Sequence, residues 1–343
     1  MTNNNKNNDS KNNKEEKTFM HWADSFALKI EERVKQDPQL QLIVKKKGYF
    51  VYDEKTPSGK IHIGAGRGWI IHDAVAKALR DRGLNAKFTL SSDDMDPFDK
   101  VPNYLDFEKY KQYLGVPFRN IPSPVKGYES YATYYFSLCT DKFKEFGIEC
   151  DLASTGQDYI DGKFNNTIKI ALDNAKKIQE IYARFSRKGS IGTERFPFNP
   201  ICDKCGKIAT TLVTAWDSKK EIITYKCTED LVSWAKGCGH EGKKSPYNGG
   251  GKFPWKVEWA AKWPTQGVIM ETAGKDHFSK GGSRSVAIAI ADEVFDYPAP
   301  YPSTRTEPGD AYEFFTIGGK KMSTSKGRGI SFDEMTNYAP ANM

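Results

Sequence analysis

The stretch Pro57-Ser58-Gly59-Lys60-Ile61-His62-Ile63-Gly64-Ala65 decides the fold of this sequence, because it joins a predicted strand to a predicted helix through a glycine-containing turn. The strand before it is the apolar segment Tyr49–Tyr52. The helix after it carries apolar residues at helical spacing, namely Trp69, Ile70, Val75, Ala78 and Leu79. A second strand, Lys87–Leu90, follows Gly83, which sits where a helix ends. This strand–helix–strand order predicts a βαβ unit and therefore a parallel sheet.

The rest of the chain continues the alternation of helices and strands. An early amphipathic helix is indicated by Trp22, Phe26, Ala27 and Ile30, and the start of a late helix by the capping-box spacing of Ser331 and Glu334. Between them we expect helices at Tyr131–Phe146, Phe164–Arg187, Val257–Trp263 and Ser285–Phe295, and strands at Glu149–Ala153, Gly267–Glu271 and Tyr312–Ile317. The pattern predicts an α/β fold with a doubly wound parallel sheet and one insertion.

Composition shifts divide the chain into four parts. Residues 1–17 are almost entirely Asn, Lys, Asp, Ser and Glu, so we expect a disordered tail; a loose contact of its lysines with RNA is the alternative. Residues 18–200 and 245–343 are predicted to form the two parts of the α/β domain. The cysteine-bearing residues 201–244 are predicted to form the insertion between them.

Size and composition place the chain among ordinary globular proteins. It has 343 residues, of which 38% are hydrophobic and 28% charged, and its formal net charge is +7. This basic excess fits a nucleic-acid partner without requiring one. The longest apolar run, near Val286–Ala291, is far shorter than a membrane span, and the N-terminus lacks the basic-then-apolar order of a secretory signal. We therefore expect a cytoplasmic protein.

Four of the six cysteines have the spacing of a metal site. Cys202 and Cys205 are separated by two residues on a turn, an arrangement that directs two thiolates at one point. Cys227 and Cys238 are expected to supply the other two ligands of a tetrahedral zinc ion, with His240 as an alternative to Cys238. Four protein ligands leave no position for a water molecule, so this zinc is expected to be structural. Four free structural cysteines are the other interpretation.

The surroundings of these cysteines suit a zinc ribbon. Two short strands, Thr210–Thr214 and Glu221–Lys226, are predicted between the two cysteine pairs. The remaining cysteines, Cys139 and Cys150, lie on a predicted helix and a predicted strand. We expect both to be small buried hydrophobic residues.

The turn at residues 57–65 is a candidate anion-binding site. It precedes a helix N-terminus, where backbone N–H groups and the positive end of the helix dipole favour anionic ligands. Its glycines and those that follow are expected to let a ligand approach the backbone closely; they are Gly59, Gly64, Gly66 and Gly68. His62 is expected at the same anion-binding site, where its ring can donate a hydrogen bond to a phosphate oxygen on which negative charge develops.

A second candidate is the stretch Gly318-Gly319-Lys320-Lys321-Met322-Ser323-Thr324-Ser325-Lys326-Gly327, which follows the predicted strand Tyr312–Ile317. Its lysines, hydroxyls and flanking glycines predict a mobile cationic loop that closes over a triphosphate. A solvated basic surface loop is the alternative. Neither a Walker-type loop nor a dinucleotide-binding G-x-G-x-x-G occurs, so the usual P-loop and NAD interpretations lack support.

In their order and in their position after the first and last strands, these two stretches together resemble the paired signatures of class I aminoacyl-tRNA synthetases. Other stretches are similar to class I lysyl-tRNA synthetases in particular. They are His21-Trp22-Ala23-Asp24, Thr56-Pro57-Ser58-Gly59, Asp93-Asp94-Met95-Asp96 with Lys100-Val101-Pro102, Lys256-Val257-Glu258-Trp259-Ala260-Ala261-Lys262-Trp263, Gly274-Lys275-Asp276-His277 and Gly281-Gly282-Ser283. The resemblance runs from about Met20 to the end of the chain and implies a Rossmann-like catalytic domain with an inserted zinc ribbon.

This resemblance implies a lysine–tRNA ligase that forms lysyl-adenylate from lysine and ATP and then transfers the lysyl group to lysine tRNA. Magnesium is expected with the ATP. The implied catalytic residues are His62, Lys321 and Lys326. The implied ATP-binding residues are Pro57, Ser58, Gly59, His62, Gly64, Ala65, Gly274, Asp276, His277, Lys321, Met322, Ser323 and Ser325. The ε-ammonium of lysine requires a desolvated acidic partner, for which Asp93, Asp94 and Asp96 are candidates.

Three departures from the family pattern accompany the resemblance. Ala65 replaces a frequent second His or Asn, and Thr324 replaces a frequent second lysine for which Lys326 is close enough to compensate. Family members continue into a helical region that reads the anticodon, whereas few residues follow Lys326 here. We expect either a fragment or a chain that reads no anticodon. The alternative functions are a class I synthetase for another amino acid, a truncated paralogue with a non-tRNA acceptor, and a zinc-ribbon nucleic-acid-binding protein without catalysis.

Overall fold

The structure, a computed structural model, describes residues 20–185, 195–279, 281–303, 311–313, 315–322 and 329–338. The predicted tail and residues 323–328 of the lysine-rich stretch lie outside this part of the chain. Within it, no helix combines the length and the apolar character that a membrane span requires.

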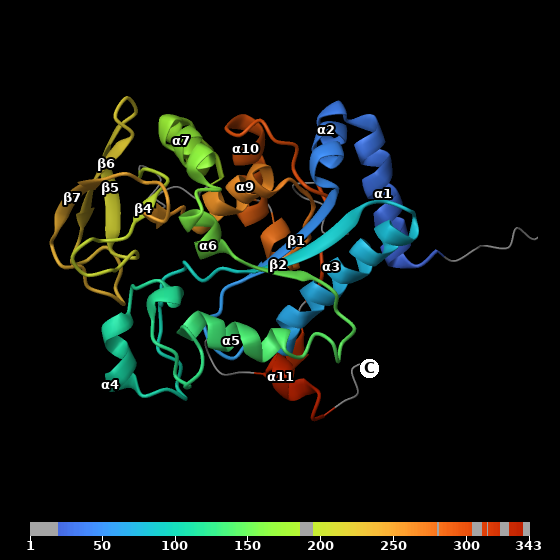
Figure 1. The fold of residues 1–343 in the computed structure, drawn as a ribbon, viewed down its shortest axis with the longest axis horizontal. Coiled ribbons are helices and arrows are strands. Elements are labelled where there is room, and N and C mark those ends of the chain that lie inside the picture. Colours follow the sequence, from blue (N-terminus) through green and yellow to red (C-terminus); the bar gives the residue numbers. More distant parts are fainter. Residues whose placement is uncertain are drawn as a thin grey trace, which may run out of the picture.

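A four-stranded parallel sheet forms the centre of the molecule. Its strands are β1 (Tyr49–Lys55), β2 (Ala86–Ser92), β3 (Asp151–Ser154) and β9 (Val268–Met270), in the spatial order β3-β2-β1-β9. β1 pairs with β2 along its whole length and with β9 on its other side, and every pairing is parallel. The prediction of a parallel sheet with helices is therefore confirmed, and Figure 1 shows β1 and β2 at the centre of the molecule.

Helices cover both faces of this sheet because the side chains of β1 alternate between two separate cores. Tyr49 and Val51 belong to one core, and Phe50 and Tyr52 to the other. The first core is built with α1 (Trp22–Gln36), α2 (Pro38–Lys47), α3 (Ile63–Asp81), α5 (Tyr131–Thr140) and α11 (Phe332–Met335). The second is built with α6 (Thr155–Ile160), α7 (Asn165–Asp173), α8 (Ala175–Phe185), α9 (Trp255–Gln266) and α10 (Ser283–Glu293).

The order of the strands places a topological switch point at β1. The chain passes from β1 to β2 through α3 on one face, and it reaches β9 after the helices of the other face. In open α/β sheets, ligands bind outside the carboxyl ends of the strands at such a point. The turn that follows β1 is the stretch singled out from the sequence.

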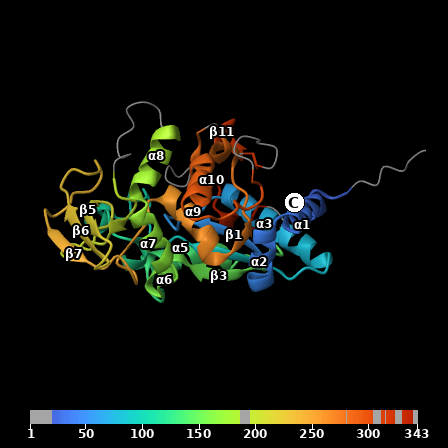
Figure 2. The same cartoon turned by 90° about the horizontal axis from the view of Figure 1, so that it is seen from above.

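Two smaller parts flank the sheet. Between β2 and β3, short helical turns surround an aromatic cluster; they are α4 (Phe107–Tyr110), η1 (Lys111–Tyr113) and η2 (Phe118–Asn120). Between α8 and α9, the strands β5 (Thr211–Asp217), β6 (Ile222–Cys227) and β7 (Glu241–Lys244) form an antiparallel sheet, which lies at one end of the molecule in Figures 1 and 2. A short antiparallel pair, β4 (Asn199–Pro200) and β8 (Gly251–Lys252), closes this segment at its base.

Two expected helices are shorter than predicted. The helix expected at Tyr131–Phe146 ends at Thr140 and is followed by turns up to Gly147, whose φ of 66° is left-handed. The helix expected at Phe164–Arg187 is divided at Asn174 into α7 and α8. The side-chain amide of Asn174 donates to the Ile170 carbonyl, and its backbone leaves the helical region with ψ 24°.

The strand expected at Tyr312–Ile317 does not join the parallel sheet. Of its described residues, Tyr312 makes an isolated parallel bridge to Gly274, and β10 (Thr316–Ile317) pairs antiparallel with β11 (Lys320–Lys321). Gly318 and Gly319 form the turn with φ of 55° and 71°, the left-handed conformation of a two-residue hairpin turn. The lysine-rich stretch therefore begins in a hairpin and not at the end of a sheet strand.

Candidate active site

A cavity of about 900 Å³ opens at the carboxyl ends of β1, β2 and β9. Many of the residues predicted to bind substrates line it, namely Ser58, His62, Gly64, Ala65, Asp93, Asp96, Gly274, Asp276, His277 and Met322. Pro57 and Gly59 belong to the same turn as Ser58 but do not line the cavity, and neither does Asp94. The switch point of the sheet and the two signature stretches therefore meet at one site.

The turn after β1 is held by the chain segment that follows the lysine-rich stretch. His62 is the N-cap residue of α3 and pairs with Ser331 in an antiparallel bridge. The amide of Ile63 donates to the Ile330 carbonyl at 3.0 Å, and the amide of Phe332 donates to the Ile61 carbonyl at 2.8 Å. The beginning of α3 and the beginning of α11 are thus joined by backbone hydrogen bonds.

Two of the signature glycines, which we expected to let a ligand approach the backbone, lie against side chains of the protein itself. At Gly59, with φ of 150°, an added Cβ would lie 2.3 Å from the Tyr104 hydroxyl oxygen. That hydroxyl accepts a hydrogen bond from the amide of Lys60 at 2.8 Å. At Gly66, an added Cβ would lie 2.3 Å from the ring of Phe332. Distant segments therefore pack directly against the backbone of this turn and helix.

A buried histidine connects α3 to the chain leaving β9. His72 donates from Nδ1 to the Gly68 carbonyl at 2.7 Å and accepts at Nε2 from the amide of Thr272 at 3.1 Å. Burial lowers the pKa of His72 to about 4, so the ring is neutral and can hold both bonds. The residues that follow Thr272 include Gly274, whose backbone bridges to Tyr312. His72 thereby fixes the start of the segment predicted to bind ATP.

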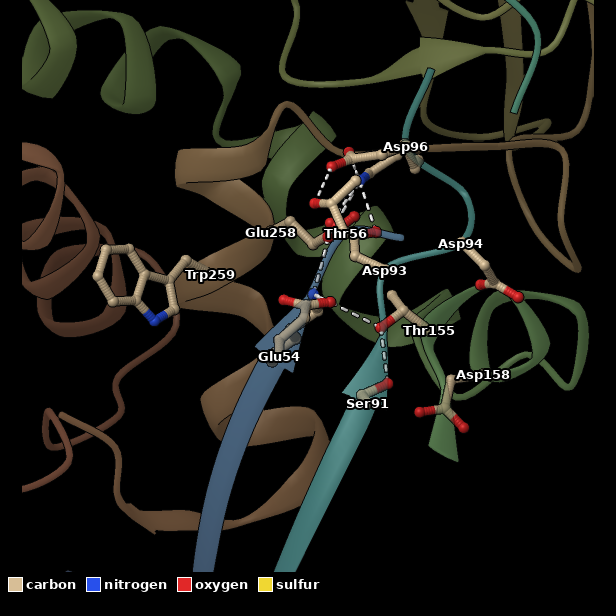
Figure 3. A network of polar contacts seen from close by, with 12 residues as sticks. Glu54, Thr56, Ser91, Asp93, Asp94, Asp96, Thr155, Asp158, Glu258 and Trp259 are labelled. Carbon is tan, nitrogen blue, oxygen red and sulfur yellow. Dashed lines mark hydrogen bonds and ion pairs between the residues drawn. The ribbon is translucent and has the colours of Figure 1, made fainter. Parts of the chain in front are cut away.

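Asp93 and Asp96, two of the predicted lysine-binding residues, are paired with a lysine of the protein itself (Figure 3). Lys252 Nζ lies 2.9 Å from Asp93 Oδ1, contacts Asp96 Oδ1 and lies 3.2 Å from Glu258 Oε1. Only 3% of the Lys252 side chain is exposed. Thr56 donates to Asp96 Oδ2 at 2.8 Å. These carboxylates line the cavity but already hold one buried ammonium group.

The same network extends to a second buried lysine. Lys262 Nζ contacts Glu54 and lies 2.8 Å from Glu258 Oε1. Thr155 donates to Glu54 at 2.7 Å, and Tyr159 donates to Glu258 at 2.8 Å (Figure 3 shows the carboxylates and Thr155). Four carboxylates, those of Glu54, Asp93, Asp96 and Glu258, surround two ammonium groups, which leaves an excess of negative charge when all are ionised.

This arrangement shifts the ionisation of its members. Burial acts against the charged form of Lys252, but Asp93 and Asp96 outweigh it and hold the pKa of Lys252 well above its usual value. Burial and the adjacent charge of Asp93 raise the pKa of Asp96 to about 7. Burial likewise holds the pKa of Glu54 well above its ordinary range. The raised pKa values keep protons on this cluster, which reduces the excess of negative charge at the carboxyl ends of β1 and β2.

Asp94, the third predicted lysine-binding residue, points away from the cavity (Figure 3). Its carboxylate accepts hydrogen bonds from Ser154 at 2.7 Å and from the amide of Gly156 at 2.8 Å, and it lies 3.6 Å from the Arg119 guanidinium. These contacts fix the start of α6 against the end of β2.

Two further carboxylates line the cavity and were not singled out from the sequence. Glu271 accepts from the indole nitrogens of Trp259 at 2.7 Å and Trp263 at 2.5 Å. Asp53 accepts from the amide of Glu54 at 2.8 Å. Within the described part of the chain, neither forms an ion pair with a lysine or arginine. Burial raises the pKa of Asp53 to about 7. Both groups can therefore accept an incoming cation without displacing one of the protein's own.

The raised pKa of Asp53 predicts a pH-dependent loss of stability. The folded chain keeps the Asp53 proton up to about pH 7, whereas the unfolded chain releases it near pH 4. The folded state thus binds more protons between these values, and the free energy of unfolding falls as the pH rises through them. The D53N variant has no carboxyl group at this position and therefore lacks this pH-dependent loss of stability. We expect its free energy of unfolding, relative to that of wild type, to increase from about pH 4 to about pH 7 and then to level off.

Urea unfolding of both proteins across this range measures the difference. Parallel stability curves for D53N and wild type would show that Asp53 titrates normally in the folded chain. Asp151, which is exposed on the edge strand β3, provides the matched control, because D151N removes a carboxylate that is largely solvated.

The four candidate metal ligands converge within the antiparallel sheet. The thiols of Cys202, Cys205, Cys227 and Cys238 all lie within 4.8 Å of one another, and the pairs Cys202–Cys238 and Cys205–Cys227 are each 3.7 Å apart between sulfurs. A tetrahedral zinc ion with bonds of about 2.3 Å places its sulfurs about 3.8 Å apart. The four thiols therefore fit zinc. His240 is outside this group, and its carbonyl accepts from the amide of Cys227.

Several residues that shape the site could not be found in the sequence. Three of them contact residues that are distant in the chain, namely Lys252, His72 and Phe332. No local sequence pattern predicts those contacts. Glu258 and Lys262 were visible as an oppositely charged pair at helical spacing, but such pairs usually lie on a solvated face. Here the pair is buried, since the side chains of both residues are 1% exposed.

The family model described as "tRNA synthetases class I (K)" matches residues 20–343. The match includes the turn after β1, the segment leaving β9 and the lysine-rich stretch. Together with the parallel sheet and the site at its switch point, these features define a class I tRNA synthetase fold. The chain belongs to the class I (K) family of tRNA synthetases.

Curated relatives support the same assignment. The chain is 36% identical over 308 residues to a lysine–tRNA ligase of Methanosphaera stadtmanae, covering 90% of this chain and 52% of the relative. It is 35% identical over 324 residues to that of Methanocaldococcus jannaschii, covering 93% and 56%. It is 36% identical over 323 residues to that of Methanosarcina barkeri, covering 94% and 54%. The chain thus spans about half the length of these relatives.

A more distant likeness is found among solved structures. A tyrosyl-tRNA synthetase of Leishmania major in complex with tyrosinol superposes with a TM-score of 0.40 at 13% identity, covering 90% of this chain and 42% of that one. The family assignment does not rest on this likeness.

Proposed function

We propose that this chain activates lysine with ATP and transfers the lysyl group to lysine tRNA. The observation that carries the proposal is the shared cavity at the switch point, which is lined by the turn after β1, by the segment after β9 and by Met322 of the lysine-rich stretch. The family assignment and the relatives named as lysine–tRNA ligases support the same reaction.

In this proposal the nucleotide lies along the turn after β1 and the segment after β9. Residues 57–65 present the amide of Gly64, at the N-terminus of α3, and the ring of His62 to the phosphates. Gly274, Asp276 and His277 bind the adenosine part. Lys321, Met322, Ser323, Ser325 and Lys326 provide the remaining contacts to the triphosphate. Magnesium bound with ATP supplies positive charge that offsets the charge on the departing pyrophosphate.

The lysine side chain is proposed to bind among the cavity carboxylates. Asp93 and Asp96 remain candidates for the ε-ammonium, because both line the cavity and belong to a group of four carboxylates that share two ammonium groups. Asp53 and Glu271 are added as candidates, because both line the cavity without a lysine or arginine partner among the described residues. If Asp53 binds the ammonium, it must lose its proton first, so the KM for lysine falls as the pH rises toward 7.

A test of the proposed function is ATP–pyrophosphate exchange with each of the twenty amino acids, in the presence and absence of total tRNA. Exchange that depends on lysine supports the proposal, and exchange with another amino acid would overturn the specificity while keeping the class of reaction. H62A is expected to lower the exchange rate about 100-fold, in line with the loss of one donor to developing charge. H21A, which removes a histidine that does not line the cavity, is the matched control.

We further propose that residues 201–244 form a zinc ribbon and that Cys202, Cys205, Cys227 and Cys238 are the ligands. The fit of the four sulfurs to a tetrahedron supports this proposal. Such a site is closed to water and stabilises the local fold.

The zinc proposal makes a simple prediction about metal content. Wild type and C150S, whose thiol lies outside the cluster, are expected to hold about one zinc ion per chain by elemental analysis. C205S is expected to lose most of its zinc, because serine is a poor ligand for this ion. Equal zinc content in C205S and C150S would rule out the cluster as the binding site.

A further inference from the structure

The cysteine-bearing segment contributes directly to the wall of the cavity. Ile208, Ala209 and Trp234 from this segment line the cavity beside Asn199 of β4 and Phe118 of η2. This part of the wall belongs neither to the turn after β1 nor to the segment after β9. The loops around the sheet β5-β6-β7 therefore form part of the site.

Hydrogen bonds connect this wall to the carboxyl end of β2. The amides of Ile208 and Ala209 donate to the Gly115 carbonyl at 2.7 and 3.2 Å. The amide of Gly115 donates in turn to the Phe98 carbonyl at 2.9 Å, and the amide of Phe118 donates to the Asp96 carbonyl at 3.0 Å. The position of the wall relative to the acidic residues is thus fixed through the backbone.

Trp234 lies at the tip of a turn between two of the cysteines of the cluster. Val232 and Ala235 pair across this turn, which falls after Cys227 and before Cys238. The indole is half-buried and lines the cavity. Within the described part of the chain, no other aromatic ring stacks against it. A large, flat and partly exposed π-system therefore forms part of the cavity wall.

The surroundings of Trp234 suit a nucleotide more than an amino-acid side chain. Lys207 precedes Ile208 in the chain, and Lys236 follows Trp234 by two residues; the Lys207 ammonium donates to the Lys236 carbonyl at 2.8 Å. Lys236 and Lys204 are exposed and available for phosphates, although Glu229 and Asp230 are exposed nearby. Aromatic faces flanked by lysines are typical of sites for unpaired nucleotides.

We propose that the indole of Trp234 stacks on an unpaired nucleobase at the 3′ end of the RNA acceptor. This inference rests on the proposed function, which requires that end to reach the cavity. The cysteine cluster then has a role in substrate binding, since it holds the turn that carries Trp234. The nucleotide part of ATP, by contrast, is assigned to the turn after β1 and the segment after β9.

The test uses the zinc-loaded 343-residue chain and an RNA hairpin with a single-stranded 3′ CCA end, whose terminal adenine is replaced by fluorescent 2-aminopurine. Stacking on the wild-type indole is expected to quench this fluorophore. W234F is expected to keep the quenching, whereas W234L, which preserves an apolar wall, is expected to lose it and to bind the RNA roughly tenfold more weakly. W216F, on the same sheet but with its indole bonded to Asp173 of α7, is the matched control and should behave as wild type.

The outcomes separate this inference from the proposed function. Equal quenching and equal RNA affinity in W234L and wild type would overturn the role of Trp234, as would failure of the wild-type chain to quench at all. ATP affinity, measured in parallel by calorimetry, should be the same in W234L and wild type; a matching loss would place the indole against ATP and overturn the proposal. Loss of quenching in W234L from a chain without lysine-dependent exchange would support the inference while contradicting the proposed function.

Discussion

The K252M variant is expected to lose about 3–5 kcal/mol of unfolding free energy, because it leaves three buried carboxylates without their shared cation. Lys252 is 3% exposed and contacts Asp93, Asp96 and Glu258, which come from the end of β2 and from α9. Methionine preserves much of the side-chain volume, so the loss is electrostatic and not a packing defect. Equilibrium unfolding in urea measures it.

The loss of stability expected for K252M depends on the burial of the Lys252 ion pairs. An exposed ion pair provides the comparison. Lys226 forms an ion pair with Glu241 at 3.0 Å, but the two side chains are 48% and 66% exposed. K226M should therefore change the unfolding free energy by less than about 1 kcal/mol. Adding D93N to K252M removes one of the uncompensated charges, since the ion pair of Asp93 is with Lys252, and should recover part of the stability. Equal effects of K252M and K226M would mean that the Lys252 network is solvated in solution.

The position of Lys252 also gives this network a role in the site. Lys252 belongs to β8, which closes the cysteine-bearing segment, whereas its partners lie at the carboxyl end of β2 and on α9. The buried charges thus attach that segment to the central sheet directly beside the cavity. Buried polar networks are sensitive to geometry, since every unpaired member is costly. The same contacts therefore stabilise the fold and orient the cavity carboxylates.

The regular parts of this fold could be predicted because their signals are local. The strand at Tyr49–Lys55 is apolar and continuous, as expected for a strand buried on both faces, and the glycine-containing turn after it marks the change to a helix. The four cysteines were expected to share one site, and their thiols do lie together; the signal is local, because only two residues separate Cys202 from Cys205. In each case neighbouring residues carry the information.

The parts that were wrong or missing depend on individual side-chain contacts, which a residue pattern does not specify. The helix expected at Phe164–Arg187 has a continuous helical pattern, yet the side chain of Asn174 competes for a backbone carbonyl and divides it. The acidic run after β2 was expected to bind substrate lysine, but nothing near it in the sequence indicates that Lys252 pairs with it. Sequence patterns identify the charged residues, whereas only the fold determines which charges face one another.

The F332A variant is expected to lower the unfolding free energy by about 3–5 kcal/mol, the usual cost of removing a fully buried phenylalanine ring. The Phe332 side chain is fully buried and lies against Trp69 and Phe146, with ring centroids 5.0 and 4.4 Å away. Phe107, which is 57% exposed, provides the control, and F107A should change stability by less than about 0.5 kcal/mol.

The same ring explains why position 66 is glycine. A Cβ at Gly66 would lie 2.3 Å from two atoms of the Phe332 ring, so G66A should destabilise the protein even though alanine is the better helix former by about 1 kcal/mol. The F332A change removes the obstructing ring. In that background G66A should be neutral or should stabilise the protein by up to about 1 kcal/mol.

A double-mutant cycle over these two positions measures that reversal directly. The coupling should be favourable and exceed about 1 kcal/mol, because the clash that makes G66A harmful is absent once the Phe332 ring is removed. Additive losses would instead mean that Phe332 does not occupy the space beside Gly66, and that the start of α11 is not seated on α3. That contact matters for function, because the bridge between His62 and Ser331 can form only while the two helices remain together.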